Sequence, residues 1–121
     1  MVVTQISLTA IVVQVQTDID TTYTHIAIGD NNTAPTVGDI ALGNETFREI
    51  FFQDGTTLTT FFAEIFLDTT ENNGNDIKET GMFDAGAAGN MFNRSLTNVI
   101  TKSTNVEAFI KHIINIQAIN S

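Results

Sequence analysis

Turn-forming residues recur along the chain and leave only short apolar runs between them. Polar segments lie at 18–22, 30–38, 68–76 and 84–89, and Asp54-Gly55 has the composition of a two-residue hairpin turn. The runs between these segments have strand-like composition, and they cover 23–29, 45–53, 56–67, 77–83, 91–101 and 105–119. Repeated short strands at this spacing predict an all-β chain, folded as one antiparallel β-sandwich domain over residues 1–121.

Alternation within the last run predicts how it packs. In 105–119 one parity is apolar and the other largely polar, which is typical of a half-buried strand. Phe109 and Ile113 interrupt the polar parity. The segment 39–44 is at most a short turn of helix. We therefore expect the last run to be a strand with some apolar side chains on its outer face.

Residues 1–22 are open to two interpretations. Val12 to Thr17 alternate between apolar and polar residues as a strand does, whereas Ser7 could be the N-cap of a short helix. Helix and strand remain alternatives, and we treat 1–22 as a candidate assembly arm. The apolar run 6–15 lacks the basic leader of a signal peptide and is shorter than the roughly 20 residues that cross a bilayer. We therefore expect a soluble chain without a cleaved signal.

Composition limits the classes of partner. Fourteen Asp and Glu against five Lys and Arg give a formal net charge of −9. Nucleic acid and anionic membranes both need clustered basic side chains, so neither is an expected partner. The chain has no Cys, which excludes disulfides and thiolate metal sites. With 42% hydrophobic residues, nine of them Phe, the chain can form a substantial core.

The sequence carries no recognisable catalytic motif. It has four Ser but no Gly-x-Ser-x-Gly elbow, and it has no glycine-rich phosphate loop. His25 and His112 both fall within predicted strands, where a packed or surface histidine is the commoner outcome. Accidental carboxylate pairs are inevitable among fourteen acids, so they do not indicate a glycosidase. We therefore expect a protein that is not an enzyme.

One loop has some features of a calcium site. The segment 68–79 has oxygen-bearing side chains at positions one, three and five and Glu at position twelve. An EF-hand needs Gly at position six, but Gly74 is at position seven, and the flanks are predicted strands rather than helices. An irregular Ca²⁺ site in this loop, or around Asp30 and Asp39, is a weak alternative. The expectation is no cofactor.

Three motifs occur in a characteristic order. The first runs from THIAIGD at 24–30 through TAPT at 33–36 to LGNE at 42–45. The second is IKETGMFD at 77–84, and the third is Arg94 followed by Lys102. In this order the motifs resemble small structural proteins of tailed bacterial and archaeal viruses, of the tail-fibre or tail-associated type.

This resemblance implies a virion structural protein, made in the host cytoplasm and acting by contact. It implies a component of a tail fibre, baseplate or adhesin that self-associates, as a trimer or higher, and binds other virion proteins. A capsid decoration protein and an extracellular glycan-binding module are the alternatives. The candidate edges for strand exchange between subunits are 6–15 and 105–119, and the loops 30–38 and 68–76 would be free for host or partner contact.

The resemblance also assigns structural or assembly roles to nine residues. They are Gly29, Asp30, Asp39, Arg48, Glu79, Gly81, Phe83, Arg94 and Lys102. We expect the two glycines to adopt backbone conformations closed to other residues, and Phe83 to fill the core. Because arginine is scarce in this acidic chain, we expect Arg48 and Arg94 to be paired, with Glu79 among the paired charges.

Overall fold

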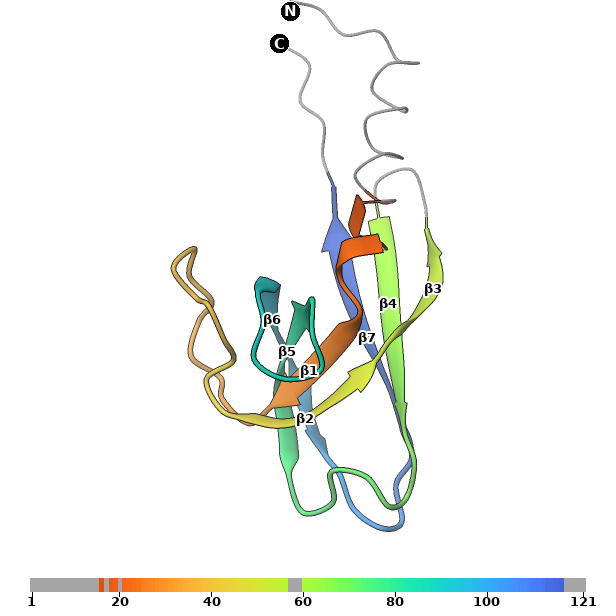
Figure 1. Cartoon of the computed structure of the whole chain (residues 1–121). Helices are drawn as coiled ribbons and strands as arrows, with labels where there is room; N and C mark the ends of the chain where they lie inside the picture. Colours follow the sequence, from red (N-terminus) through yellow and green to blue (C-terminus); the bar gives the residue numbers. More distant parts are fainter. Residues whose placement is uncertain (1–15, 17, 20, 57–59, 117–121) are drawn as a thin grey trace, which may run out of the picture.

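In the part of the chain that the structure describes, seven antiparallel strands form two sheets (Figure 1). The computed structural model describes residues 16, 18–19, 21–56 and 60–116. The strands are β1 (His25–Gly29), β2 (Glu45–Ile50), β3 (Phe52–Thr56), β4 (Thr60–Leu67), β5 (Asp76–Phe83), β6 (Met91–Thr101) and β7 (Ala108–Asn115). The first sheet has the order β2-β1-β5-β6 and the second the order β3-β4-β7, so the predicted all-β antiparallel fold is confirmed. No helix within the described residues has the length and apolar character that crossing a membrane requires.

The main core lies between the two sheets. Alternate residues of β1, β4 and β7 point into this core, as the period of two requires. Ile26 and Ile28 of β1 meet the inward side chains of β4, among which Phe61 and Leu67 are fully buried. On β7 the predicted parity is confirmed, because Ile110, His112 and Ile114 are buried, while Phe109 and Ile113 are exposed.

The segment before β1 differs from the sequence prediction. Gln16, Asp18, Ile19, Thr21 and Thr22 are helical rather than a polar turn, and the backbone N–H of Tyr23 donates to the Ile19 carbonyl at 2.9 Å. The reason is packing, since Ile19 is only 3% exposed and belongs to the main core. The choice between helix and strand for 1–15 falls outside the described residues.

The predicted strand 45–53 and its hairpin turn are wrong. The chain leaves the first sheet after β2 and enters the second at β3, with Phe51 between them. Phe51 packs against the main core, and its ring meets that of Phe61 edge-on with centroids 6.2 Å apart. Asp54 and Gly55 lie inside β3, where the register shifts by one residue, so the pair forms a bulge and not a turn.

A second, smaller core covers the outer face of the first sheet. Ala27, Phe83 and Leu42 are buried there, with Met91 packed against them. Ala27 and Phe83 come from β1 and β5, but Leu42 comes from the long loop between β1 and β2, which has no helical turn at 39–44. This loop extends sideways from the sandwich beside the β5–β6 connection (Figure 1).

Candidate functional site

The loop 30–44 is fixed to the outer face of the first sheet by an apolar contact. Leu42 is 8% exposed and packs with Ala27 and Phe83. A Cβ at Gly81 would lie 2.8 Å from Cδ2 of Leu42 and 3.1 Å from Sδ of Met91. Gly81 is therefore needed because Leu42 occupies the space above it. The expectation of a special backbone conformation at Gly81 is wrong, since its φ is not positive.

A buried carboxylate lies at the base of the same loop. Glu79 on β5 is 0% exposed, and its two oxygens accept hydrogen bonds from the backbone N–H groups of Gly43 (2.8 Å) and Asn44 (2.9 Å). A Cβ at Gly29 would lie 2.6 Å from Oε2 of Glu79. Gly29 is thus also required by close approach and not by a positive φ. Burying a charge is costly unless it is paired and hydrogen-bonded, and Glu79 meets both conditions.

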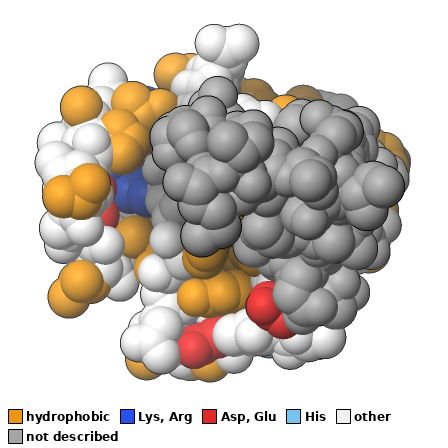
Figure 2. All heavy atoms as spheres, turned by 90° about the horizontal axis from the view of Figure 1, so that it is seen from above, with side chains coloured by type: hydrophobic (Ala, Val, Ile, Leu, Met, Phe, Trp, Pro, Cys, Tyr) orange, Lys and Arg blue, Asp and Glu red, His pale blue; other side chains and the backbone are white. Residues whose placement is uncertain are grey.

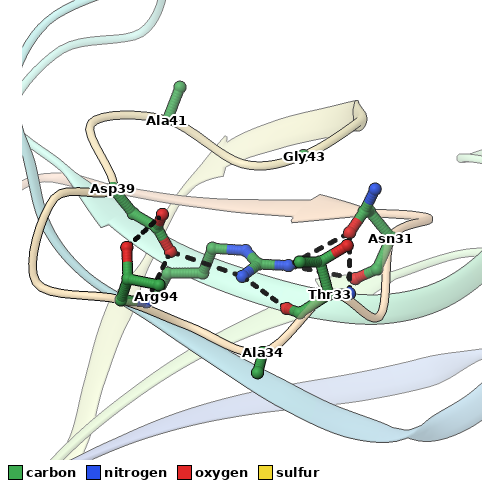
Figure 3. A pocket seen from close by; sticks show the side chains of 8 residues that line it. Asn31, Thr33, Ala34, Asp39, Ala41, Gly43 and Arg94 are labelled. Atoms are coloured by element: carbon green, nitrogen blue, oxygen red, sulfur yellow. Dashed lines mark hydrogen bonds and ion pairs between the residues drawn. The ribbon is translucent and has the colours of Figure 1, made fainter.

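Arg94 on β6 is the partner of Glu79. Its Nε donates to Oε1 of Glu79 at 2.7 Å, and its Nη1 donates to the Thr33 carbonyl at 2.8 Å. Nη1 also lies 3.4 Å from Oδ2 of Asp39, and Nη2 donates to the Asn31 carbonyl at 3.2 Å. Figure 3 shows the guanidinium between Asp39 on one side and Asn31 with Thr33 on the other. The Arg94 side chain is only 4% exposed, so these bonds form largely out of contact with water.

Asp39 ties the outer part of the loop to this cluster. Its carboxylate accepts the backbone N–H of Thr36 at 3.0 Å and the Thr36 hydroxyl at 2.9 Å. These hydrogen bonds, and after them the positive charge of Arg94, lower the pKa of Asp39 below its ordinary value. We call Asp39, Glu79 and Arg94, with the loop backbone they bind, the loop clamp.

Arg48 forms a second connection beside the clamp. It makes a two-point ion pair with Glu45, at 2.6 Å from Nη2 to Oε1 and 2.9 Å from Nε to Oε2. Its Nη1 donates to the carbonyls of Ala85 and Ala88 in the β5–β6 turn. The guanidinium lies 3.7 Å above the Phe83 ring, close enough for a cation–π contact. Phe83 is 2% exposed, in the smaller core.

The remaining predicted residues lie apart from the clamp. Asp30 pairs with Lys78 at 3.0 Å, with both side chains about one-third exposed. Lys102 is fully buried at the opposite loop, where its Nζ donates to Oδ1 of Asn73 at 2.9 Å and to the Ser103 carbonyl at 3.1 Å. The structure thus places eight of the nine residues in or around the loop 30–44, with Asp30 at its start, and it places Lys102 at the loop 68–75.

The loop that the clamp holds also presents apolar side chains, which were not among the predicted site residues. Val37 and Ile40 are 110% and 84% exposed at the tip of the loop. A hollow of about 220 Å³ lies under the loop, lined in part by Asn31, Thr33 and Arg94. A second hollow of about 490 Å³ lies between the loop and the start of β6. Seen from above, apolar side chains gather on the side of the molecule where the loop projects (Figure 2).

The clamp is held together by hydrogen bonds and ion pairs among its own groups. The polar groups of the clamp bind one another, so their donors and acceptors are already engaged. Within the described residues no group of three or more His, Asp or Glu could hold a metal ion. In the loop 68–75, the Asp68 carboxylate accepts the Thr70 backbone N–H at 2.7 Å. The weak calcium alternative gains no support from this geometry and stays a prediction.

Comparison with known proteins adds no family to this description. No protein-family model matches the chain, and a search of curated proteins finds no match. The resemblance to viral tail proteins therefore rests on the motif residues alone.

Proposed function

We propose that this protein is a non-enzymatic structural subunit of a virion, part of a tail fibre, baseplate or adhesin. The loop clamp is the observation that carries the proposal. In the clamp, hydrogen bonds join a buried arginine to two carboxylates and to the backbone of one loop. They hold the loop in place and leave its tip exposed. The viral assignment comes from the motif resemblance, and two motif residues, Glu79 and Arg94, are part of the clamp.

A fixed loop is advantageous for a protein that works by binding. Ordering a loop on association costs conformational entropy, and a loop that is already ordered avoids that cost. The clamp orders the backbone from Asn31 to Asn44 before any partner arrives. Val37 and Ile40 are then available as apolar anchors on a preformed surface.

Repeated copies of such a subunit strengthen weak contacts. We propose self-association and binding to other virion proteins, with neither nucleic acid nor a membrane as partner. In a symmetric assembly each copy presents the same loop, so many weak contacts act together. The net charge of −9 keeps separate copies soluble before assembly.

A glycan-binding module is the second candidate. The hollow of about 220 Å³ under the loop is lined by polar side chains that include Asn31, Thr33 and Thr36. Amides and hydroxyls of this kind bind sugar hydroxyls. Binding of free oligosaccharides to the isolated protein, lost in Thr36→Val, would favour this candidate. The capsid decoration alternative has no separate structural support.

Immunogold electron microscopy tests the proposal. Antibodies raised against the purified protein are applied to particles released by cells that carry the gene, with antiserum absorbed on the protein as control. Gold on tails or fibres is the expected result. Gold on heads would replace the proposal with capsid decoration, and particles without gold would refute a virion role.

The loop tip is tested in the same particles. The double variant Val37→Asp/Ile40→Asp removes the apolar anchors without touching the clamp, and Thr69→Asp at the exposed tip of the other loop is its matched control. We expect normal folding of both variants but a loss of incorporation, or of host attachment, only in the first. Equal behaviour of the two variants would contradict a contact role for the loop.

A further inference from the structure

The free edges of the two sheets are not alike. β2, β3, β6 and β7 are the edge strands of the described sheets. The pairing of β2, β3 and β6 with their neighbours is interrupted by register shifts at one or two points. At each shift the edge strand has more residues than the strand that it pairs with, which makes a bulge in the edge strand. Bulges of this kind twist an edge and oppose pairing with another chain. Three of the four edges are therefore protected.

β7 is the exception. It pairs with β4 from Ala108 to Asn115 without any register shift, and its eight residues include no proline. Among the described residues its other edge, about 27 Å long at the usual rise per residue, has no strand partner and carries a regular row of backbone donors and acceptors. The outer face beside it is apolar, since Phe109 is 66% exposed and Ile113 is 46% exposed. Phe109 also stacks on Phe66 of β4, with centroids 4.8 Å apart.

Charges of opposite sign lie on the two sides of Phe109, so they can pair between two copies of the same strand. Glu107 directly precedes the first residue of β7, two residues before Phe109, and Lys111 lies two residues after Phe109. All three side chains are exposed, so they share one parity when the pairing extends β7 by one residue to Glu107. When two such strands run antiparallel about a two-fold axis at Phe109, Glu107 of each copy faces Lys111 of the other. A register centred on Lys111 would instead place two lysines opposite each other. Lys111 is 43% exposed; its Nζ lies 3.9 Å from Oε2 of Glu64 and 5.3 Å from the centroid of the Phe62 ring, and Glu107 of a second copy would add a carboxylate to these contacts.

We infer that β7 is a homotypic interface, on which β7 of a second copy pairs antiparallel across a two-fold axis at Phe109. This inference deepens the proposed function, because it names one contact of the assembly. The pairing joins two three-stranded sheets into one of six strands and brings the two Phe109 rings together. A dimer is then the unit from which any larger assembly is built through another surface.

A charge-exchange experiment tests both the edge and the register. The full chain is measured by light scattering across a serial dilution, as wild type, as Glu107→Lys, as Lys111→Glu, and as a mixture of the two variants. Asn98→Lys, an exposed position on the bulged edge strand β6, is the control for added positive charge. Circular dichroism shows that each variant is folded.

The proposal predicts one pattern of masses. Wild type and Asn98→Lys are dimers that dissociate on dilution. Glu107→Lys and Lys111→Glu, each measured alone, are monomers at concentrations tenfold or more above the midpoint of wild-type dissociation. The mixture forms dimers again, because the two lysines that flank Phe109 in Glu107→Lys face the two glutamates that flank it in Lys111→Glu. This recovery also shows that neither variant is merely misfolded.

Other patterns overturn the inference. A wild-type monomer at every concentration would mean that Lys111 protects the edge against pairing. Association that is equal in all variants, or variants that stay apart when mixed, would exclude this register. These outcomes are independent of immunogold labelling, so the inference and the virion role can fail separately.

Discussion

His112 connects the two sheets through a buried polar network, which makes folding sensitive to acid. The side chain is 1% exposed, and its Nδ1 lies 2.7 Å from the Thr80 hydroxyl on β5. Its Nε2 lies 2.6 Å from Oδ1 of Asn93 on β6. Because a carboxamide oxygen only accepts, Nε2 carries a proton and donates. Burial keeps the ring neutral near pH 7, so Nδ1 has no proton and accepts from the Thr80 hydroxyl. The network therefore uses the neutral imidazole.

Burial lowers the pKa of His112 from 6.5 to about 4. A folded-state pKa below the unfolded one stabilises the fold above pH 6.5, and this stabilisation is lost as the pH falls from 6.5 toward 4. At about 1.4 kcal/mol per pKa unit, the full effect is on the order of 3 kcal/mol. Most of it, roughly 2–3 kcal/mol, is lost between about pH 7.5 and about pH 4.5. That is a large fraction of the stability of a small domain.

Urea unfolding at pH 7.5 and pH 4.5 measures this loss. His112→Gln cannot titrate, so its free energy of unfolding is expected to fall less than that of the wild type, by roughly 2–3 kcal/mol. Subtracting the acid-induced loss of His112→Gln from that of the wild type removes the contribution of the carboxylates, because these titrate in both proteins. His25→Gln is the matched control, because burial and Arg48 lower the pKa of His25 as well, but that side chain is only partly buried. Equal acid losses in wild type and His112→Gln would refute the reasoning, as would an NMR-measured pKa of His112 near its ordinary value of 6.5.

The loop clamp and its surroundings give two further predictions, both measured by urea unfolding at pH 7.5. Arg94→Ala leaves the carboxylate of Glu79 buried without its ion pair and is expected to cost about 3–5 kcal/mol. Glu45→Ala removes a carboxylate that is about one-third exposed and leaves Arg48 bonded to the Ala85 and Ala88 carbonyls, so it is expected to cost less, about 1 kcal/mol. Similar costs would show that the clamp is not special. Gly81→Ala places a methyl group against Leu42 and is expected to cost about 1–3 kcal/mol by overpacking, and a neutral effect would mean that the loop can shift away at no cost.

The strands were largely predictable because alternation and turn chemistry are local. β5, β6 and the parity of β7 follow from short windows of sequence, and so does the loop 68–75. The hairpin at Asp54-Gly55 failed for a non-local reason. The same dipeptide suits a turn and a bulge, and the choice was made by Phe51, which packs against the core as the chain crosses between sheets. No local pattern contains that information.

The sequence predicted that the two arginines would form ion pairs, but it did not predict how the pairs are arranged. Scarce arginines in an acidic chain predict ion pairs, and the structure pairs Arg94 with Glu79 and Arg48 with Glu45. Which acid meets which arginine depends on the strand register. In the β5–β6 register Arg94 is opposite Gly81 rather than Glu79, so its side chain reaches Glu79 diagonally along the sheet. Spacing in the sequence cannot give such a diagonal contact across a bulged pair.

The two proposed contact surfaces belong to different sheets, and this separation has a mechanical consequence. The loop clamp covers the outer face of the first sheet, whereas the β7 edge belongs to the second. Pairing through β7 would therefore leave Val37 and Ile40 exposed on both copies. The main core and the His112 network join the sheets rigidly, so the distance between the two loop tips of a dimer would be fixed. A partner with two sites at that spacing would bind the dimer far more tightly than the monomer, because the second contact forms at a high effective concentration.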